Sequence, residues 1–581
     1  MRDFEVILRT PWGGPWRAFR EPSAVLTAWR PDEVRPCLDA IDRAVRDDGV
    51  YAAGFVTYEA ASGFGLPARS APPAGLPLVA FGVFPSGHVT FQGRPRPAGT
   101  CQVGPWTPSV THDEYLQAVR QIKASIEAGN TYQINYTFRL RAPWSGDPLA
   151  LLADLHAAQL GQWGAFASTG RHAICSASPE LFFVWNDGRL ECRPMKGTAR
   201  RGLWTADDLA RGEALRHSAK NRAENVMIVD MVRNDMGRVA QVGSVEVASM
   251  FDVERYPRQW QMTSTVVADA PGVHAPAFFE ALFPSGSVTG APKHSSMQII
   301  RDLECSPRGI YTGAIGYFSP RGRGHFNVAI RTVMLDRETG QAEFGVGSGV
   351  VWDSVDRDEY DECLLKASIL VEPPRAFRLL ETIGYSFQGG FALLDRHLER
   401  MQASAGYFGF EFDADEARRL LSRAVVDLLG ASRVRLLLAR DGSIVCEAVD
   451  LGQAPAAPLR AALATSPIDP LDAFLYHKTT RRDVYDEARA SRPDADAVIL
   501  WNPAGEVTEG TEANLVALID GRKVTPPITC GLLAGTLRAE LLASGEIAEA
   551  RITIAALRDA EHVWLINSVR GWMDVGPEVD G

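Results

Sequence analysis

Two consecutive prolines, Pro373 and Pro374, divide this chain into two segments of different sequence character. Proline cannot continue a helix, and it restricts the backbone of the residue before it. The sequence before the pair, DEYDECLLKASILVE, has the periodicity of a helix. The sequence after it, AFRLLETIGYSFQGGFALL, has the pattern of strands. We therefore predict one domain over 1–372 and a second over 376–581, joined by almost no linker.

The composition of the chain limits the kinds of ligand and the cellular location that we expect for it. The 581 residues are 46% hydrophobic and 23% charged, which suits a soluble globular protein with a large core. A net charge of -11 gives no basic surface for nucleic acid and fits a small anionic substrate held by a few local cations. We find no signal peptide, no apolar run of roughly 18 residues that could span a membrane, and no CxxC pair among eight cysteines. We therefore expect a cytoplasmic protein with reduced thiols and no membrane partner.

The first segment mixes strand and helix patterns, which predicts an α+β fold with antiparallel sheet. Strands over 178–185 and 189–197 are expected to pair through a hairpin turn at Asn186-Asp187-Gly188. Further expected elements are helices over 216–240 and 291–304, and strands over 309–319, 325–335 and 342–352.

Five charged residues are set into these apolar elements. Glu180 follows Ser-Pro at a strand start, and Glu224 lies on the long helix. Glu359 and Glu362 share a helix face, with Lys366 one turn beyond. Because Mg²⁺ often takes a pair of carboxylates plus substrate oxygens, Glu224 and Glu362 could form such a site. The alternative is ordinary salt bridging on a helix surface.

Two glycine-rich loops, FPSGSVTGAPK and GVGSGVVWDS, place glycines and hydroxyl residues near helix starts. Backbone N–H groups in such loops can hold a carboxylate, although the same text also suits tight turns. Arg331 ends the apolar run NVAIRTV, and an arginine in that setting usually has a carboxylate partner from the protein or from a ligand.

Seven motifs occur in a fixed order: SPELFF, PMKGTARR, AENVMIVDMVRNDMGRVA, FPSGSVTGAPKHSSMQIIRDLE, GIYTGAIGYFS, AIRTV and GVGSGVVWDSVDRDEYDE. Over roughly residues 110 to 370 the chain thereby resembles the chorismate-utilising enzymes, which include the large components of anthranilate and aminodeoxychorismate synthases. The fold this implies is a β-sandwich with helices.

The resemblance implies a role for each matching residue. It implies Mg²⁺ bound by Glu224 and Glu362, with Glu359 nearby, and Glu180 as the acid that protonates the departing C4 hydroxyl of chorismate. The residues implied to bind the substrate are Thr289, Gly290, Tyr311, Arg331, Gly347, Gly349, Lys366 and Gln261. The family often has histidine at the position of Gln261, and glutamine cannot shuttle a proton near neutral pH.

Lys196 in PMKGTARR distinguishes members of the family. Anthranilate synthases typically carry a small residue there, whereas aminodeoxychorismate synthases carry lysine. In the latter the lysine is thought to attack C2 of chorismate, after which ammonia adds at C4 and expels it. A neutral amine is needed for that attack. The alternative for Lys196 is a surface lysine with its head in water.

The second segment contains FRLLETIGY, LLDRHLERMQASAGYFGF, FLYHKTTRRDVYDEA, VTEGTEANLVAL, PPITCGLLAGTLRAELL and LINSVRGW. In this order they resemble the fold-type IV pyridoxal-phosphate enzymes, which include aminotransferases and aminodeoxychorismate lyase. The resemblance implies cofactor attachment at Lys478 and Glu509 as the partner of the pyridinium nitrogen. Phosphate-binding residues are implied at Arg400, Gly535, Thr536, Leu537 and Ser568, with Val569 beside the last. It also implies a homodimer through this domain.

Together the halves predict amination of chorismate to 4-amino-4-deoxychorismate, followed by elimination of pyruvate to give 4-aminobenzoate, a folate precursor. No cysteine has the setting of a class I glutaminase nucleophile, so ammonia is expected from a separate glutamine amidotransferase subunit. Two alternatives stay open. One is an anthranilate-type synthase fused to an amino-acid transaminase, and the other is a scaffold that docks a glutaminase.

Overall fold

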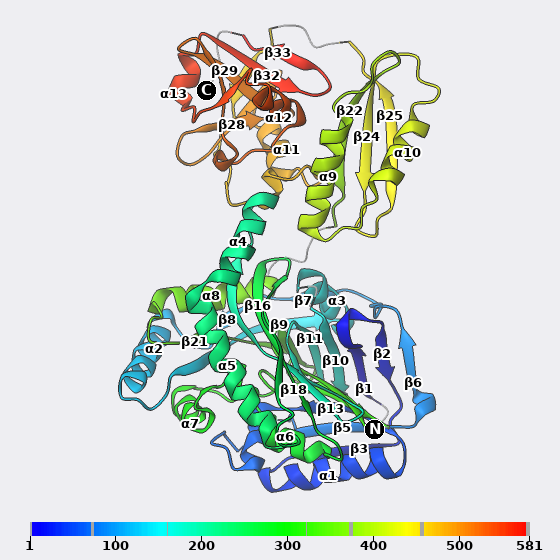
Figure 1. The fold of residues 1–581 in the computed structure, drawn as a ribbon, viewed down its shortest axis with the longest axis vertical. Helices are drawn as coiled ribbons and strands as arrows, with labels where there is room; N and C mark the ends of the chain where they lie inside the picture. The colour runs from blue at the N-terminus through cyan, green and yellow to red at the C-terminus, as the bar shows by residue number, and fades with distance from the viewer. Residues whose placement is uncertain are drawn as a thin grey trace. The chain divides into compact units, whose positions relative to one another are not determined.

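A computed structural model describes residues 3–70, 75–159, 161–320, 322–370, 376–453 and 458–576 (Figure 1). The predicted boundary prolines Pro373 and Pro374 lie outside these ranges. The chain forms two compact units. The first unit comprises Met1–Arg201 and Gly212–Pro374, and the second comprises Gly202–Arg211 and Arg375–Gly581.

The first unit is built on two large, mainly antiparallel sheets. The strands of the first sheet are β1 (Phe4–Arg9), β2 (Trp16–Phe19), β6 (Val89–Gln92), β7 (Cys101–Val103), β8 (Thr107–Pro108), β9 (Gln133–Gly146), β10 (Trp163–Thr169), β11 (His172–Ser178), β17 (Gly290–Ala291), β20 (Thr332–Asp336) and β21 (Gln341–Val350). Those of the second sheet are β3 (Ala24–Ala28), β4 (Tyr51–Val56), β5 (Val79–Phe84), β12 (Leu181–Asn186), β13 (Arg189–Arg193), β14 (Met195–Arg200), β15 (Glu246–Arg255), β16 (Gln259–Asp269), β18 (Ala314–Ser319) and β19 (Arg323–Val328).

Central strands of both sheets are buried on both faces. In β1, Val6 and Leu8 pack in an apolar cluster that also holds Phe55 of β4, so this cluster joins the two sheets. Ile7 of β1 points the other way, into a cluster shared with helices. Because successive side chains of a strand point to opposite faces, burial on both sides requires a continuous apolar run, and β4 (YAAGFV) is such a run.

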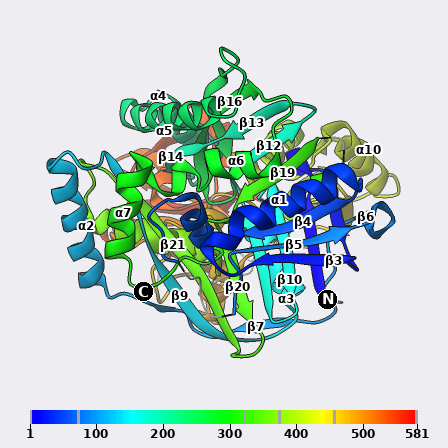
Figure 2. The ribbon, with the colours of Figure 1, turned by 90° about the horizontal axis from the view of Figure 1, so that it is seen from below.

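Helices cover the outer faces of the two sheets. Figure 2 shows α1 lying across β4 and β5, and its buried residues belong to the same cluster as those strands. The helices of this unit are α1 (Pro31–Asp47), α2 (His112–Glu127), α3 (Pro148–Gln159), α5 (Ala219–Gly237), α6 (Ala275–Leu282), α7 (Lys293–Leu303) and α8 (Asp356–Ala367), while α4 (Thr205–His217) begins in the second unit.

Several predicted elements are confirmed. Strands β12 and β13 pair antiparallel around a two-residue loop, Asp187-Gly188, and both loop residues have positive φ. This is the backbone that a tight hairpin requires. The α+β class is confirmed, and α7 and β21 lie within two residues of their predicted bounds, whereas β18 begins only at Ala314 of the strand predicted over 309–319.

Three predicted elements are wrong because each is broken in two. The strand over 189–197 is divided at Pro194 between β13 and β14. The helix over 216–240 is interrupted at Ser218, whose side chain accepts the N–H of Asn221 and starts α5 as its N-cap. The strand over 325–335 is interrupted at residues 329–331, where the chain passes from β19 in one sheet to β20 in the other. Arg331, at this crossing, has φ 52°, a left-handed conformation that ends regular strand structure.

The second unit contains a four-stranded and an eight-stranded sheet. The smaller sheet has β22 (Leu379–Ser386), β23 (Gly390–Phe391), β24 (Ser432–Leu438) and β25 (Ile444–Asp450), with helices α9 (Leu394–Phe408) and α10 (Ala414–Ala424). The larger has β26 (Ala461–Leu463), β27 (Ala497–Trp501), β28 (Val507–Gly510), β29 (Asn514–Ile519), β30 (Arg522–Thr525), β31 (Ala548–Glu549), β32 (His562–Asn567) and β33 (Gly571–Asp574), with α11 (Asp483–Ala490), α12 (Thr536–Ala543) and α13 (Ile554–Arg558).

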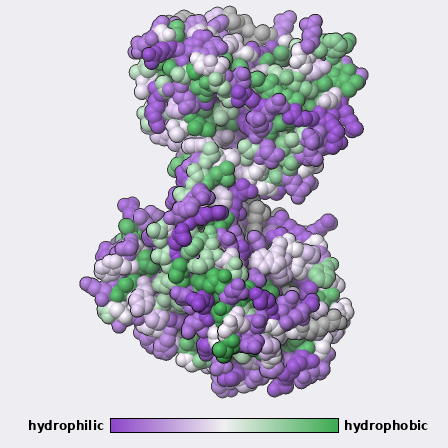
Figure 3. All heavy atoms as spheres, in the orientation of Figure 1, coloured by the Kyte–Doolittle hydropathy of each residue, from purple (hydrophilic) through white to green (hydrophobic). Residues whose placement is uncertain are grey.

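The surface is largely polar. Figure 3 shows hydrophilic residues over most of the face in view, with hydrophobic residues in scattered groups. Within the described ranges, every helix is too short or too polar to cross a membrane.

A buried ion pair links separate parts of the first unit. Arg308 donates to both carboxylate oxygens of Glu304, at 2.7 and 3.0 Å, and the two side chains are 1% and 4% exposed. The same guanidinium donates to the carbonyl oxygens of Val288 (2.8 Å) and Asn135 (2.7 Å). The Glu304 carboxylate also accepts from the backbone and hydroxyl of Thr137.

We predict that Glu304→Ala lowers the free energy of unfolding of the first unit by about 3–5 kcal/mol, because Arg308 would remain buried without its carboxylate. The matched control is Asp269→Ala, which removes an exposed pair with Arg189 and should cost at most about 1 kcal/mol. Urea unfolding measures both. If both variants lost the same free energy of unfolding, the buried pair would stabilise the fold no more than an exposed pair does.

Candidate active sites

Lys196 lies on β14 with its side chain 16% exposed, so it is not a surface lysine. Its Nζ is 3.6 Å from Oε2 of Glu224 on α5. A Cβ atom at Gly349 of β21 would lie only 2.4 Å from the same Nζ, so the amine occupies the space that this glycine leaves open. Asn225 donates to the carbonyl oxygen of Lys196 at 3.1 Å, which holds the strand in place.

Glu180 lies between β11 and β12 and is 3% exposed. The hydroxyl of Ser287 donates to its Oε1 at 2.5 Å. Burial raises the pKa of Glu180 to about 7, although the Ser287 hydrogen bond and the charge of Lys196 oppose the rise. A carboxyl with such a pKa holds a proton near neutral pH and can donate it.

On α8, Glu362 pairs with Lys366 at 2.6 Å, and Lys366 also donates to the carbonyl oxygen of Gly347 at 2.9 Å. The pKa of Glu362 is lowered, first by Lys366 and then, against the effect of burial, by Lys196 and Arg331. The structure therefore brings the predicted residues of α8, β14 and β21 into one charged region.

Tyr311 is buried, and Arg331 is half-buried and lies near it. Arg331 donates weakly to the carbonyl oxygen of Lys366, at 3.4 Å, while its Nε has no hydrogen-bond partner among the described residues. The ring of Tyr311 packs directly on Gly345. An unpaired buried guanidinium N–H is a donor available to an anion.

The predicted pocket residues Thr289 and Gly290 pack against β9. Gly290 pairs with Ile134, and a Cβ atom at Gly290 would lie 2.1 Å from the carbonyl oxygen of Gln133. Thr289 accepts the N–H of Asn135 on its carbonyl oxygen. The glycine at 290 is required because there is no room for a side chain.

Gln261 lies behind β14, and its amide is fully engaged. Its Nε2 donates to the carbonyl oxygen of Gly197 at 2.9 Å, and its Oε1 accepts from Thr198 and Gln259. In this arrangement Gln261, on the neighbouring strand β16, supports the part of β14 that follows Lys196. A direct contact between Gln261 and substrate stays a prediction.

The three predicted metal ligands, Glu224, Glu359 and Glu362, do not form one cluster. Among the described residues, no group of three or more histidine, cysteine, aspartate or glutamate side chains could hold a metal ion. Glu359 accepts a short hydrogen bond from Ser348. Glu224 and Glu362 both interact with the Lys196 amine, and two carboxylates plus substrate oxygens are a donor set that suits Mg²⁺.

Gln133 was missed by the sequence interpretation. Its side chain is wholly buried at the start of β9, and neither amide atom has a hydrogen-bond partner within the described part of the chain. Its Nε2 would lie 3.1 Å from a Cβ at Gly349, so it faces the same space as Lys196. A buried amide without partners is costly, which marks it as a candidate contact for a polar ligand.

In the second unit, Lys478 is the center of a buried polar site. Burial and then the charge of Arg400 lower the pKa of Lys478 to about 8, against the opposing effect of Glu381 and Glu509. Arg482, which sequence reasoning missed, contributes to the lowering and donates to the carbonyl oxygen of Thr511 at 2.6 Å.

Glu509 on β28 is held by three donors. They are the hydroxyl of Tyr485 (2.9 Å), the amide of Asn514 (3.0 Å) and the backbone N–H of Leu533 (3.0 Å). Burial raises the pKa of Glu509 to about 7, and these hydrogen bonds and Lys478 limit the rise. A positive ring nitrogen placed beside Glu509 would favour its ionised form.

Arg400 makes a bidentate pair with Glu381, at 2.6 and 2.8 Å, and donates to the carbonyl oxygen of Ala534 at 3.0 Å. It therefore holds the loop that leads to Gly535, the N-cap of α12. Burial raises the pKa of Glu381, but Arg400 and His397 outweigh it and lower the pKa to about 2.

The predicted phosphate-binding hydroxyls meet at one imidazole. Nε2 of His397 lies 3.0 Å from Oγ of Ser568 and 3.2 Å from Oγ1 of Thr536. A Cβ atom at Gly535 would lie 1.9 Å from Oδ1 of Asn514, so this loop requires glycine. Hydroxyls and a helix N-terminus next to a buried lysine fit the phosphate and the aldehyde of pyridoxal phosphate.

Comparison with known proteins agrees with this geometry. The family model described as chorismate binding enzyme matches residues 4–372, and that for amino-transferase class IV matches residues 378–576. The chain belongs to the chorismate binding enzyme family. The class IV match implies pyridoxal phosphate in the second unit. Both predicted family resemblances are thereby confirmed.

Individual relatives match part of the chain. The chain is 41% identical over 287 residues to "Aminodeoxychorismate synthase" of Streptomyces griseus and 39% identical over 269 residues to "Aminodeoxychorismate synthase component 1" of Salmonella typhimurium. These matches cover 49% and 46% of this chain, and 39% and 59% of those relatives. The chain thus spans less than two thirds of either relative.

A solved structure, anthranilate synthase component I from Streptococcus pneumoniae, is similar with a TM-score of 0.51 and 24% identity. The similarity covers 64% of this chain and 92% of that one, and it supports the fold of the first unit.

The raised pKa of Glu180 predicts a pH dependence of stability. Folded Glu180 keeps its proton up to about pH 7, whereas the ordinary value is 4.5, so its contribution is lost as the pH rises between the two. From pH 5 to pH 8 the free energy of unfolding of wild type should fall by about 2–3 kcal/mol more than that of Glu180→Gln. Urea unfolding at several pH values measures this, and parallel curves would contradict it.

Proposed function

We propose that this chain makes 4-aminobenzoate in two steps. The first unit aminates chorismate to 4-amino-4-deoxychorismate, and the second eliminates pyruvate from that product. The observation that carries the first step is the Lys196 amine, which lies against Gly349 within reach of Glu224 and close to Glu180. The buried Lys478 and Glu509 support the second.

In the first step different side chains of the first unit carry out different parts of the reaction. Glu180 donates its proton to the departing C4 hydroxyl, which leaves as water. The nitrogen lone pair of Lys196, which lies 3.6 Å from Glu224, forms a bond to C2, and the positive charge falls on that nitrogen. Ammonia then bonds to C4, the bond from C2 to the lysine nitrogen breaks with its electrons returning to that nitrogen, and the positive charge passes to the new amine at C4. The nitrogen therefore ends para to the ring carboxylate.

The remaining residues hold the two carboxylates of chorismate. Tyr311 binds the enolpyruvyl carboxylate together with Arg331, whose Nε has no hydrogen-bond partner in the described part of the chain. Backbone groups around Gly347 and Gly349 receive the ring carboxylate. Mg²⁺, held by Glu224 and Glu362 with Glu359 nearby, would supply positive charge beside that carboxylate.

In the second step Lys478 attaches the cofactor and then moves a proton, for which a pKa of about 8 suits it. Bound pyridoxal phosphate supplies an electron sink. Glu509 would partner the ring nitrogen, and Thr536 and Ser568 would bind the phosphate near the start of α12, where Arg400 holds the preceding loop through the carbonyl oxygen of Ala534.

The deciding experiment incubates the purified chain with chorismate, ammonium, Mg²⁺ and pyridoxal phosphate and follows the products by mass. We expect 4-aminobenzoate and pyruvate. Anthranilate would favor an anthranilate-type synthase, and lack of turnover would favor a glutaminase-docking scaffold. Adding glutamine with a glutamine amidotransferase subunit should replace ammonium if that partner supplies the nitrogen.

Lys196→Ala should lower the rate of aminodeoxychorismate formation by at least about 10²-fold, because the nucleophile is removed. Mg²⁺ binding, measured by calorimetry, should persist. Lys220→Ala, at an exposed lysine at the start of α5, is the matched control and should behave like wild type. An unchanged rate in Lys196→Ala would refute covalent participation.

Lys478→Ala should accumulate aminodeoxychorismate and abolish the visible absorbance of the lysine-attached cofactor, because no other lysine replaces the attachment point. Lys523→Ala removes a lysine that pairs with Glu546 on the surface of the same unit and should keep both signals. Continued release of pyruvate by Lys478→Ala would assign the elimination elsewhere.

A further inference from the structure

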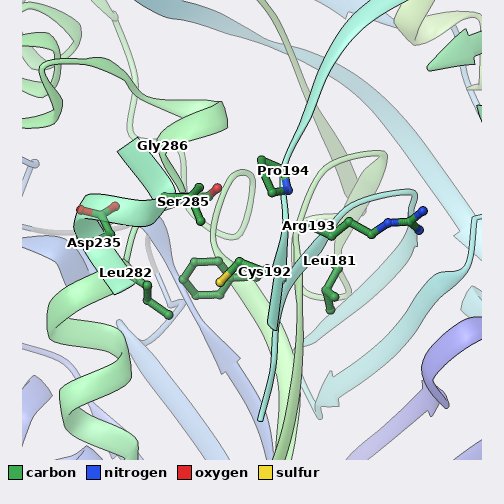
Figure 4. A pocket seen from close by; sticks show the side chains of 10 residues that line it. Leu181, Cys192, Arg193, Pro194, Asp235, Leu282, Ser285 and Gly286 are labelled. Atoms are coloured by element: carbon green, nitrogen blue, oxygen red, sulfur yellow. The ribbon is translucent and has the colours of Figure 1, made fainter. Parts of the chain in front are cut away.

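A small cavity lies behind Glu180, and the mechanism above does not use it. Its volume is about 10 Å³, room for roughly one water molecule. It is lined by Ser285 and Gly286, by Asp235 of α5, and by residues of β13 that include Cys192. Figure 4 shows the Asp235 and Ser285 side chains on one side of the cavity, while the Arg193 side chain extends away from both.

Two hydroxyls connect this cavity to Glu180. Oγ of Ser285, a lining residue, lies 2.9 Å from Oγ of Ser287. Ser287 in turn donates to Oε1 of Glu180 at 2.5 Å. Hydroxyl groups both donate and accept, so protons can pass along such a chain. Both serines come from the loop FPSGSVTGAPK, for which the sequence predicted either backbone N–H groups that hold a carboxylate or tight turns.

A buried acid–base pair stands on the far side of the cavity. Nζ of Lys293 lies 2.7 Å from Oδ2 of Asp235 and also donates to the carbonyl oxygen of Leu282. Burial raises the pKa of Asp235 and lowers that of Lys293, which makes proton transfer within the pair easier. Each side chain is 13% exposed, so the pair can exchange protons with solvent.

We propose that Ser285 and Ser287, with one water molecule in this cavity, relay protons from the Asp235–Lys293 pair to Glu180. The proposal rests on the role of Glu180 as the acid of the proposed function. Glu180 is 3% exposed, so after it has protonated the leaving hydroxyl it needs an internal route to recover its proton.

The number of protons is conserved at every step of the relay. Ser287 gives its proton to Glu180 and receives one from Ser285, which receives one from the water molecule. The water regains a proton from the Asp235–Lys293 pair, and the pair regains it from solvent. Each O–H bond that breaks is replaced by another, and no oxidant or co-reactant is needed.

The test compares Ser285→Ala with Ser285→Thr in the chorismate amination assay, using the full chain with ammonium and Mg²⁺. Removing the hydroxyl should lower kcat about tenfold, a part of what a whole acid–base group contributes, with KM for chorismate unchanged. The threonine variant keeps the hydroxyl and should restore kcat. Ser295→Ala removes the hydroxyl that donates to the carbonyl oxygen of Asn130 and is the matched control.

Rates in mixtures of H₂O and D₂O separate a relay from a structural effect. A relay moves several protons together, so the dependence of kcat on deuterium fraction should be curved in wild type and straighter in Ser285→Ala. A linear dependence in wild type, or a kcat within twofold of wild type in Ser285→Ala, would overturn the relay. Absence of amination by wild type itself would instead overturn the proposed function.

Discussion

The buried pair of Arg308 and Glu304 is the interaction on which the first site depends. One guanidinium binds the carbonyl oxygens of Val288 and Asn135, and its carboxylate partner binds Thr137. The loop before Thr289 and the start of β9 are thereby held together. In an interior of low dielectric such hydrogen bonds are strong, and a missing partner is costly, so the walls of the site keep one arrangement.

The two sites use buried lysines in different ways. Lys196 lies on the edge strand of a sheet, with its amine 3.6 Å from the carboxylate of Glu224 and in the space that Gly349 leaves open. Lys478 lies among arginines, and burial with their charge brings its pKa to about 8. The surroundings of each lysine are set by the charged side chains that the neighbouring strands and loops place beside its amine.

Several residues that the motifs singled out lie near one another in the structure. Glu180, Lys196 and Glu362 come from distant parts of the chain and do converge, as Lys478 and Glu509 do in the second unit. Residues whose importance comes only from contacts were missed. Gln133 and Arg308 sit in motifs without a distinctive local pattern, and their burial arises from elements far away in the chain. The Asp235–Lys293 pair joins α5 to α7 for the same reason.

The amino-acid sequence alone determined the hairpin at Asp187-Gly188, the amphipathic helices and the division of the chain into two segments with different motifs. Each of these features depends only on residues that are neighbours along the chain. Tertiary structure decided how the chain crosses between sheets at Arg331 and which hydroxyls meet Glu180 and His397. The hydroxyl contacts join residues more than 100 positions apart along the chain. Hydrogen bonds and desolvation act over a few ångströms, and only the packed sheets bring such groups within that range.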